Sequence, residues 1–262
     1  VRAAAEVSGA TVDGAELNSQ QLLFQPGSIR GGKFRFAVGT AGSATLVFQT
    51  VLPALLRAPE PSEVTLEGGT HNSKAPPYDF IERSFLPVLR RMGLTIDVSL
   101  QRHGFYPAGG GQFVAQVTPG ALQPVSVVDC GPVVATRARV LASRMKKGVT
   151  SREVKVIKER LGWSDVRPHS VESNGPGNVV LLELERESLT EIVAGFGERG
   201  TPAEDVAWKA CYEMSRLLES DVPVGEHLAD QLLLPMAMAG GGELRTVDLS
   251  LHTETNMAVI QR

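Results

Sequence analysis

The sequence has little of what marks several common classes of protein. Its 262 residues include only two cysteines, Cys130 and Cys211, which stand far apart and outside any metal-type spacing. This usage is not typical of a disulfide framework or a zinc site, and we expect two reduced, buried thiols in a cytoplasmic protein. No apolar run reaches the length that crosses a membrane, so we expect no membrane partner.

The familiar signatures of nucleotide-binding and hydrolytic folds are also missing. The chain contains no Gly-x-x-x-x-Gly-Lys-Ser/Thr loop, no Gly-x-Gly-x-x-Gly after a strand, no Gly-x-Ser-x-Gly and no His-Glu-x-x-His. A protein with this sequence that uses ATP would therefore do so without a standard nucleotide fold. The net charge of −3 argues against strong, unspecific nucleic-acid binding, but it leaves room for a local basic groove.

What the chain does have is an alternation of short strands and helices, which predicts an α+β fold. Alternating residues predict strands over 33–38, 63–67, 95–100 and 112–117, with helices over 43–56 and 79–92. Asp79 is the predicted N-cap of the second helix. Three predicted helices share a leucine-proline word, at Pro53, Pro87 and Pro235, which favours repeated strand–helix units with helices packed on one sheet face.

Residues 123–218 have a different texture and lack the leucine-proline helix. Strands are predicted over 133–141 and 179–185, and a basic helix over 151–161 with Ser151 as its N-cap. A basic run crosses this part of the chain and could follow a phosphate backbone, although a solvated helix face is the interpretation that the pattern favours. The run comprises Arg137, Arg139, Arg144, Lys146, Lys147, Arg152, Lys155, Lys158 and Arg160.

The stretch Arg102–Phe113 contains three consecutive glycines preceded by Arg102 and His103. Glycine lets the backbone turn sharply and can expose N–H groups to an anion or a flat ring. A plain glycine-rich hairpin between the two flanking strands is an equal alternative.

Among the five histidines, His252 is the strongest candidate for a nucleophile. Val247, Leu249 and Leu251 alternate with polar residues, which predicts a strand with His252 and Glu254 on its polar face. A carboxylate beside an imidazole can fix the tautomer and sharpen one ring nitrogen. The pattern alone also allows a surface or structural histidine, and by itself it favours that interpretation.

Residues 226–231 are predicted to open a helix, where backbone N–H groups and the helix dipole favour anions. Asp230 lies one turn into this helix. It could serve a ligand site, complement the dipole or form an ion pair.

Taken together, these sequence motifs resemble those of one family, the RNA 3′-terminal phosphate cyclases. The resemblance covers essentially the whole chain and rests on motifs in the family's order: Arg102–Gly111, Gly68–Asn72, Ala75–Pro77, Glu226–Leu232 and Leu251–Asn256. It implies a large repeat-built domain over 1–127 and 219–262, and a smaller inserted α/β domain over 128–218.

The resemblance also implies an activity and a site. The expected reaction closes an RNA 3′-phosphate end into a 2′,3′-cyclic phosphodiester, with ATP and Mg²⁺ or Mn²⁺, through a histidinyl-AMP at His252 and an RNA-adenylate. The implied ATP-binding residues are Gln49, Pro76, His227, Leu228, Ala229, Asp230 and Gln231; the metal ligands are unknown. The family often has an aromatic ring where this chain has His227.

Two alternatives stay open. One is a non-catalytic cyclase-like protein of ribosomal RNA processing, and the other is an enolpyruvyl-transferase-like enzyme of similar repeated architecture. The chain also lacks a match to the family's glycine-rich opening and to its C-terminal end. We therefore expect a longer native protein, with at best weak self-adenylation and no cyclisation by these residues alone.

Overall fold

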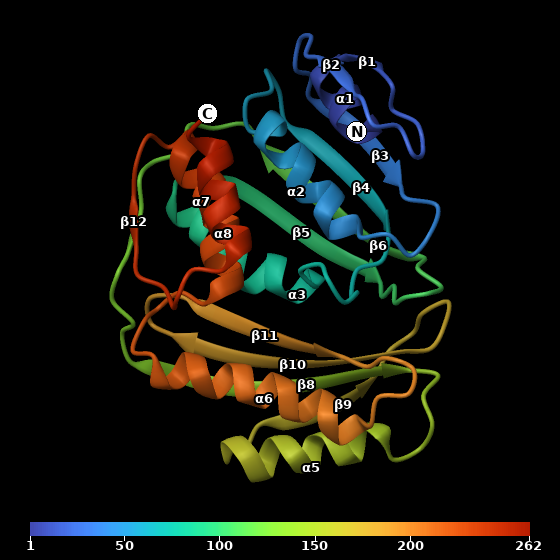
Figure 1. Cartoon of the computed structure of the whole chain (residues 1–262), viewed down its shortest axis with the longest axis vertical. Helices are drawn as coiled ribbons and strands as arrows, with labels where there is room; N and C mark the ends of the chain where they lie inside the picture. The colour runs from blue at the N-terminus through green and yellow to red at the C-terminus, as the bar shows by residue number, and fades with distance from the viewer.

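The computed structural model describes all residues 1–262, and two four-stranded sheets dominate it (Figure 1). The first sheet has the order β3-β4-β6-β5, formed by β3 (Gly32–Ala37), β4 (Ser62–Gly68), β6 (Gly111–Thr118) and β5 (Thr95–Arg102). β3 and β4 run parallel because a helix connects them, and the remaining pairs are antiparallel. Alternate residues of β4, Val64 and Leu66 among them, are buried, so one face of this sheet builds the core.

Helices cover that buried face. They are α2 (Ala44–Leu55) and a second helical segment made of α3 (Tyr78–Phe80), the π-helical turn η1 (Ile81–Phe85) and α4 (Leu86–Arg91). Ser43 caps α2, because its side chain accepts a hydrogen bond from Leu46 N–H. The prediction for Asp79 is wrong: the second segment begins after Pro77, and Asp79 is buried inside its first turn, where ionic partners hold it.

The second sheet has the order β11-β10-β8-β9, formed by β11 (Thr190–Phe196), β10 (Gly177–Arg186), β8 (Val133–Ser143) and β9 (Val166–Ser170). Helices α5 (Val149–Leu161) and α6 (Ala203–Glu219) cover one of its faces (Figure 1). β10 is buried on both faces from Asn178 to Leu184, which explains its run of apolar residues. The predicted Ser151 cap is wrong, because α5 begins after Gly148, whose left-handed backbone conformation (φ 89°) ends the loop.

The remaining elements flank the first sheet. Helix α1 (Arg2–Ser8) is followed by the hairpin of β1 (Thr11–Asp13) and β2 (Leu23–Gln25). Helix α7 (Glu226–Met238) and helix α8 (Leu251–Ile260) lie side by side, with the strand β12 (Glu243–Leu244) between them in sequence and paired to β7 (Ser126–Val127). No helix of the chain combines the length and the apolar character that crossing a membrane requires.

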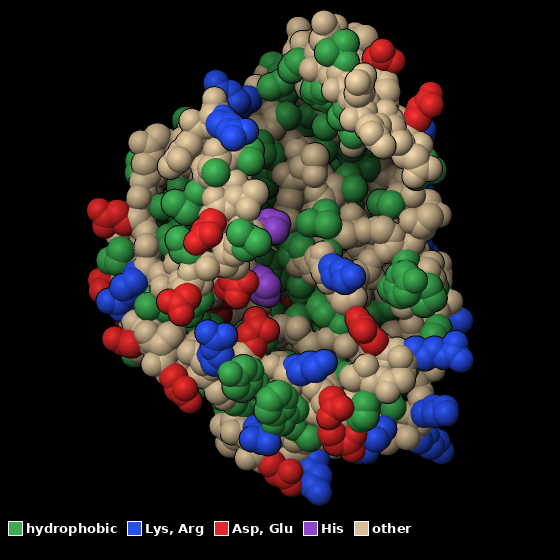
Figure 2. All heavy atoms as spheres, viewed as in Figure 1, with side chains coloured by type: hydrophobic (Ala, Val, Ile, Leu, Met, Phe, Trp, Pro, Cys, Tyr) green, Lys and Arg blue, Asp and Glu red, His purple; other side chains and the backbone are tan.

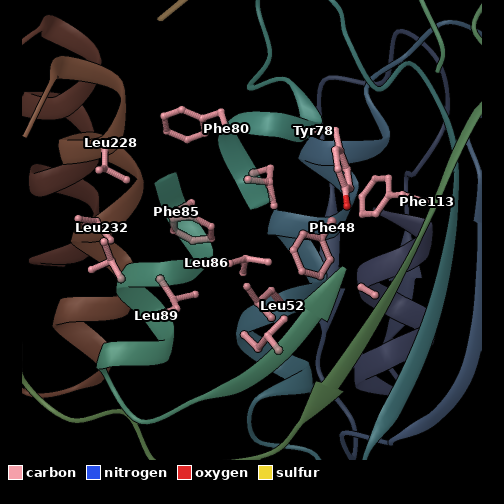
Figure 3. Close-up of a cluster of buried hydrophobic side chains, with 14 of the residues drawn as sticks. Phe48, Leu52, Tyr78, Phe80, Phe85, Leu86, Leu89, Phe113, Leu228 and Leu232 are labelled. Carbon is pink, nitrogen blue, oxygen red and sulfur yellow. The ribbon is translucent and has the colours of Figure 1, made fainter. Parts of the chain in front are cut away.

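Two hydrophobic cores hold these layers together. The larger one fills the space between α2, the α3–α4 segment and α7, as Phe48, Phe85 and Leu228 illustrate in Figure 3. It also takes in Val179, Leu181 and Ile192 from the second sheet. The smaller core lies between the second sheet and α5 and α6. The fold is therefore α+β, as predicted. The division into one domain over 1–127 and 219–262 and another over 128–218 stays a prediction. The larger core contains residues from both proposed domains, so it does not separate them.

Candidate active site

Helices α7 and α8 bring Asp230 and His252 together. His252 Nδ1 lies 3.0 Å from Asp230 Oδ1, while the imidazole is 81% exposed. Asn256, one turn further along α8, donates hydrogen bonds from Nδ2 to Asp230 Oδ1 (3.1 Å) and to the Asp230 carbonyl (3.2 Å). A carboxylate at Nδ1 favours the proton on that nitrogen, so the lone pair of Nε2 is available to an electrophile.

The local structure that presents His252 differs from the predicted one. The strand over 247–254 is wrong, because α8 starts at Leu251, and Glu254 is an exposed first-turn residue rather than a neighbour on the same face. Ser250 caps the helix by accepting a hydrogen bond from Thr253 N–H. Leu249 and Leu251 are exposed, so no buried face exists to hold the predicted strand. The carboxylate beside the imidazole is instead Asp230.

Both helices begin at the same end of the pair. Asp230 lies in the second turn of α7, and it contacts His252 in the first turn of α8. The N-terminal ends of both helices, with the positive ends of their dipoles, therefore lie near the imidazole. This arrangement favours an anion next to His252.

Helix α2 borders the same region. Figure 2 shows histidine side chains exposed beside the α7–α8 pair, where the surface is hollowed toward α2. Thr45 donates a hydrogen bond of 2.7 Å to the carbonyl of Pro76, and Gln49 lies one turn after Thr45 on the same face of α2. Gln49 and Pro76 are thus placed on one side of this helix, and both are half-buried.

The other residues implied for ATP binding divide into two groups. The side chains of Leu228 and Ala229 are buried in the larger core, so only their backbone could reach a ligand. His227 is exposed, with Nε2 3.6 Å from Glu213 Oε1 on α6, and Gln231 is half-buried. Sequence position alone could not separate these two groups, because a helix turns successive residues away from one another.

A second polar cluster lies under the glycine-rich hairpin. His71 Nε2 is 2.7 Å from Asp79 Oδ2, and Arg139 Nη2 is 2.7 Å from Asp79 Oδ1. Burial opposes ionisation of Asp79, but the His71 hydrogen bond and the charges of His71 and Arg139 together lower its pKa to about 2. The ring of His103 stacks on His71 at 5.1 Å, and burial lowers the pKa of His103 to about 4.

Sequence reasoning missed this cluster, because Asp79 and Arg139 looked like a helix cap and part of a phosphate-tracking run. Arg137 also belongs to that run, and it lies 2.8 Å from the buried Glu183, which Arg83 approaches at 2.5 Å. These cations therefore neutralise buried carboxylates between the two sheets. The residues left for a basic surface are those of α5 and its flanks.

The glycines of the hairpin serve close packing. A Cβ atom at Gly104 would collide with the backbone of Gly68 and Gly111, and one at Gly109 would collide with Thr40. Thr70 and His71 N–H both donate to the Gly104 carbonyl, which ties the end of β4 to the hairpin. The structure thus favours the interpretation of a packed hairpin over an open anion cradle.

Two buried glutamates of the second sheet and its helices were also not predicted from the sequence. Glu191 on β11 accepts a hydrogen bond of 2.5 Å from Gly225 N–H, directly before α7, and burial raises its pKa to about 8. Glu153 on α5 accepts from Asn178 Nδ2 at 3.0 Å, and burial raises its pKa to about 7. Glu191 anchors the start of the helix that carries Asp230.

No three His, Cys, Asp or Glu side chains lie together in a way that could hold a metal ion. Mg²⁺ is commonly held by one or two carboxylates together with substrate phosphates, so these residues provide no preformed cage. The expected Mg²⁺ or Mn²⁺ stays a prediction.

Comparisons with known proteins agree with the resemblance seen in the motifs. The family model described as RNA 3′-terminal phosphate cyclase matches residues 1–262. A protein of that name from Pseudomonas fluorescens is 50% identical over 264 residues, which cover 100% of this chain and 77% of the relative. Proteins of the same name from Ectopseudomonas mendocina and Ralstonia nicotianae are 47% and 50% identical, with 78% and 76% of their lengths covered.

Proposed function

Since the chain belongs to the RNA 3′-terminal phosphate cyclase family along its whole length, we propose that the reaction it serves is the ATP-dependent conversion of RNA 3′-phosphate ends into 2′,3′-cyclic phosphodiesters. The observation that carries the chemistry is the pairing of Asp230 with the exposed His252 at the N-terminal ends of two helices.

The first step is nucleotidyl transfer to His252. Nε2 attacks the α-phosphorus of ATP, a nitrogen–phosphorus bond forms, and the bond to the bridging oxygen breaks so that pyrophosphate leaves. Asp230 stabilises the positive charge that develops on the imidazole, and Asn256 orients Asp230. The N-terminal ends of α7 and α8 favour the charge on the α-phosphate.

The next two steps consume the RNA end. An oxygen of the 3′-phosphate attacks the adenylate phosphorus, and the nitrogen–phosphorus bond breaks, which frees His252 and leaves an RNA-adenylate. The adjacent 2′-OH then attacks the 3′-phosphorus, loses its proton and expels AMP. This closure suits proximity catalysis, because the nucleophile is tethered beside its target. It also requires RNA, since DNA has no 2′-OH.

We assign the nucleotide to the hollow between α2 and the α7–α8 pair. Gln49 and Pro76 would contact it from the α2 side, and His227 and Gln231 from α7. An imidazole at position 227 keeps a flat surface for the adenine but adds polarity. Leu228 and Ala229 would contribute through their backbone alone, because their side chains are buried.

Incubation with α-labelled ATP, followed by denaturing electrophoresis and acid treatment, tests this proposal. We expect an acid-labile adduct that His252→Ala abolishes and that His169→Ala, at an exposed histidine of β9, leaves intact. An acid-labile adduct that survives in His252→Ala would contradict the assignment. Asp230→Ala should slow adduct formation by more than its loss of thermal stability explains, and equal loss of both would make Asp230 merely structural.

The rival functions can be separated cheaply. A non-catalytic scaffold has no need for a carboxylate beside an exposed histidine, so the Asp230–His252 pair argues against it. An enolpyruvyl transferase would bind phosphoenolpyruvate rather than ATP, and a thermal-shift comparison of the two ligands distinguishes them.

A further inference from the structure

A cavity of about 1010 Å³ lies between the glycine-rich hairpin and the second sheet. Residues 71–74 and 105–107 form one wall, and residues 176–178, 196–199 and 201–203 form the other, with the start of α5 at one end. None of the residues assigned to the ATP site lines it. Its volume is at the upper end for small-ligand pockets, so it can hold a nucleotide together with neighbouring backbone.

Flat apolar surfaces are available inside this cavity. Tyr106 is 74% exposed, although it belongs to a hairpin whose other aromatic ring, Phe105, is buried. Phe196 lines the facing wall. An exposed tyrosine in an aromatic cavity is a surface on which any nucleobase can stack.

The charges at the cavity are mostly positive. Lys74, Arg152 and Arg199 line it, against a single carboxylate, Glu198. Arg152 is engaged with Glu204 at 3.0 Å, whereas Lys74 and Arg199 form no ion pair. Each phosphodiester of an RNA strand carries one negative charge. Two cations without carboxylate partners can therefore hold one or two phosphodiesters. A second ATP would bring about four negative charges to the same place, with Glu198 opposing them.

We propose that this cavity binds one nucleotide of the RNA strand, at a distance from the reacting 3′ end. Its base stacks on Tyr106, and its phosphodiester lies at Lys74 and Arg199. This proposal rests on the proposed function, because that function makes RNA the substrate. It adds a second point of contact between the protein and the RNA strand.

Fluorescence anisotropy with a 5′-labelled, 3′-phosphorylated RNA octamer, in the absence of ATP, tests the site. Tyr106→Ala should weaken binding about 10-fold, as expected for the loss of one stacked base. Arg199→Gln should reduce the slope of log affinity against log salt by about 1. The matched controls are Tyr212→Ala and Lys209→Gln, at exposed residues of α6 outside the cavity, and both should bind like the parent protein.

Crosslinking with 4-thiouridine in the same octamer gives a second measurement, and adducts should map to peptides containing Tyr106 or Phe196. The proposal is overturned if Tyr106→Ala binds normally, if the controls weaken binding equally, or if adducts form only elsewhere. Labelling with α-labelled ATP needs no RNA and should persist in Tyr106→Ala. Absence of the adduct in the parent protein would therefore defeat the proposed function without deciding the cavity, and normal labelling without RNA binding would defeat the cavity alone.

Discussion

At the scale of single residues, buried carboxyl groups with shifted pKa values make the folding stability depend on pH. Glu191 holds the N–H of Gly225 and so fixes the start of α7. Because burial raises its pKa to about 8 from 4.5, this group keeps its proton in the folded protein where the unfolded chain has lost it. Its contribution to stability is complete below pH 4.5, and it is lost as the pH rises through 8.

Glu191→Gln should therefore flatten the fall in stability between pH 4.5 and 8. The amide keeps an acceptor for Gly225 N–H but cannot ionise, so the variant gains relative to the parent as the pH rises, by at most about 5 kcal/mol. Urea unfolding at several pH values measures this difference. Glu219→Gln, at an exposed position of α6, should run parallel to the parent protein, and an equal pH profile for Glu191→Gln would contradict the assignment.

Single residues also show how far the sequence could predict the site. The motif around His252 identified the nucleophile candidate, and the helix start at residue 226 placed Asp230 correctly in a helix. Their contact could not be predicted, because it depends on how α7 and α8 pack. Asn256 was within reach of prediction: four residues after His252, it shares a helix face with it, but only once 251–260 is recognised as a helix.

At the scale of elements, a local helix-capping motif outweighed an alternating polar and apolar pattern that predicted a strand. Val247 to Glu254 alternates as a strand does, yet Ser250 with Thr253 forms a helix start that needs no partner strand. Ser151 shows the opposite error, since a capping residue type stands inside a helix that begins earlier. Strands with a buried face, such as β4, were predicted correctly because alternation there reflects a real core.

Ser250→Ala should loosen α8 and thereby the position of His252. Loss of this cap costs about 1 kcal/mol, which corresponds to about 5-fold faster amide exchange if α8 opens as a unit. Hydrogen exchange followed by mass spectrometry of residues 251–260 measures it. Ser151→Ala is the control, because the Ser151 hydroxyl only donates to the carbonyl of Gly148, directly before α5, and caps no N–H group. Equal acceleration of both helices by their own substitutions would mean that Ser250 has no special role.

At the scale of the whole molecule, the larger core joins parts of the chain that the motifs assigned to separate domains. Val179 and Ile192 of the second sheet belong to the same cluster as Leu66 of the first. Ion pairs to buried carboxylates, such as Arg83 of η1 with Glu183 of β10, also connect the helices that cover the first sheet to the second sheet. Sequence texture could mark the change at residue 128, but it could not reveal these contacts, because they join residues about a hundred positions apart.

Unfolding should therefore be cooperative across the proposed boundary. Both tryptophans, Trp163 and Trp208, lie within 128–218, so their fluorescence reports on that part alone, whereas far-UV circular dichroism reports on the whole chain. We expect the two urea transitions to coincide. Leu66→Ala, in the first sheet, should cost about 3 kcal/mol and shift both midpoints together. A fluorescence midpoint that is unchanged in Leu66→Ala would show that the two parts unfold independently.

The tip of the glycine-rich hairpin packs against the loop before β10, and the methyl group of Ala108 forms one of these contacts. A Cβ atom added at Gly175 would lie 2.5 Å from the Cβ of Ala108, so the two positions have room for one methyl between them. Ala108→Gly with Gly175→Ala should unfold near the parental melting temperature, whereas Gly175→Ala alone should be clearly destabilised. The methyl can therefore change sides during evolution in only one order: position 108 must lose it before position 175 gains it, and a lineage that begins with the other step loses fitness on the way.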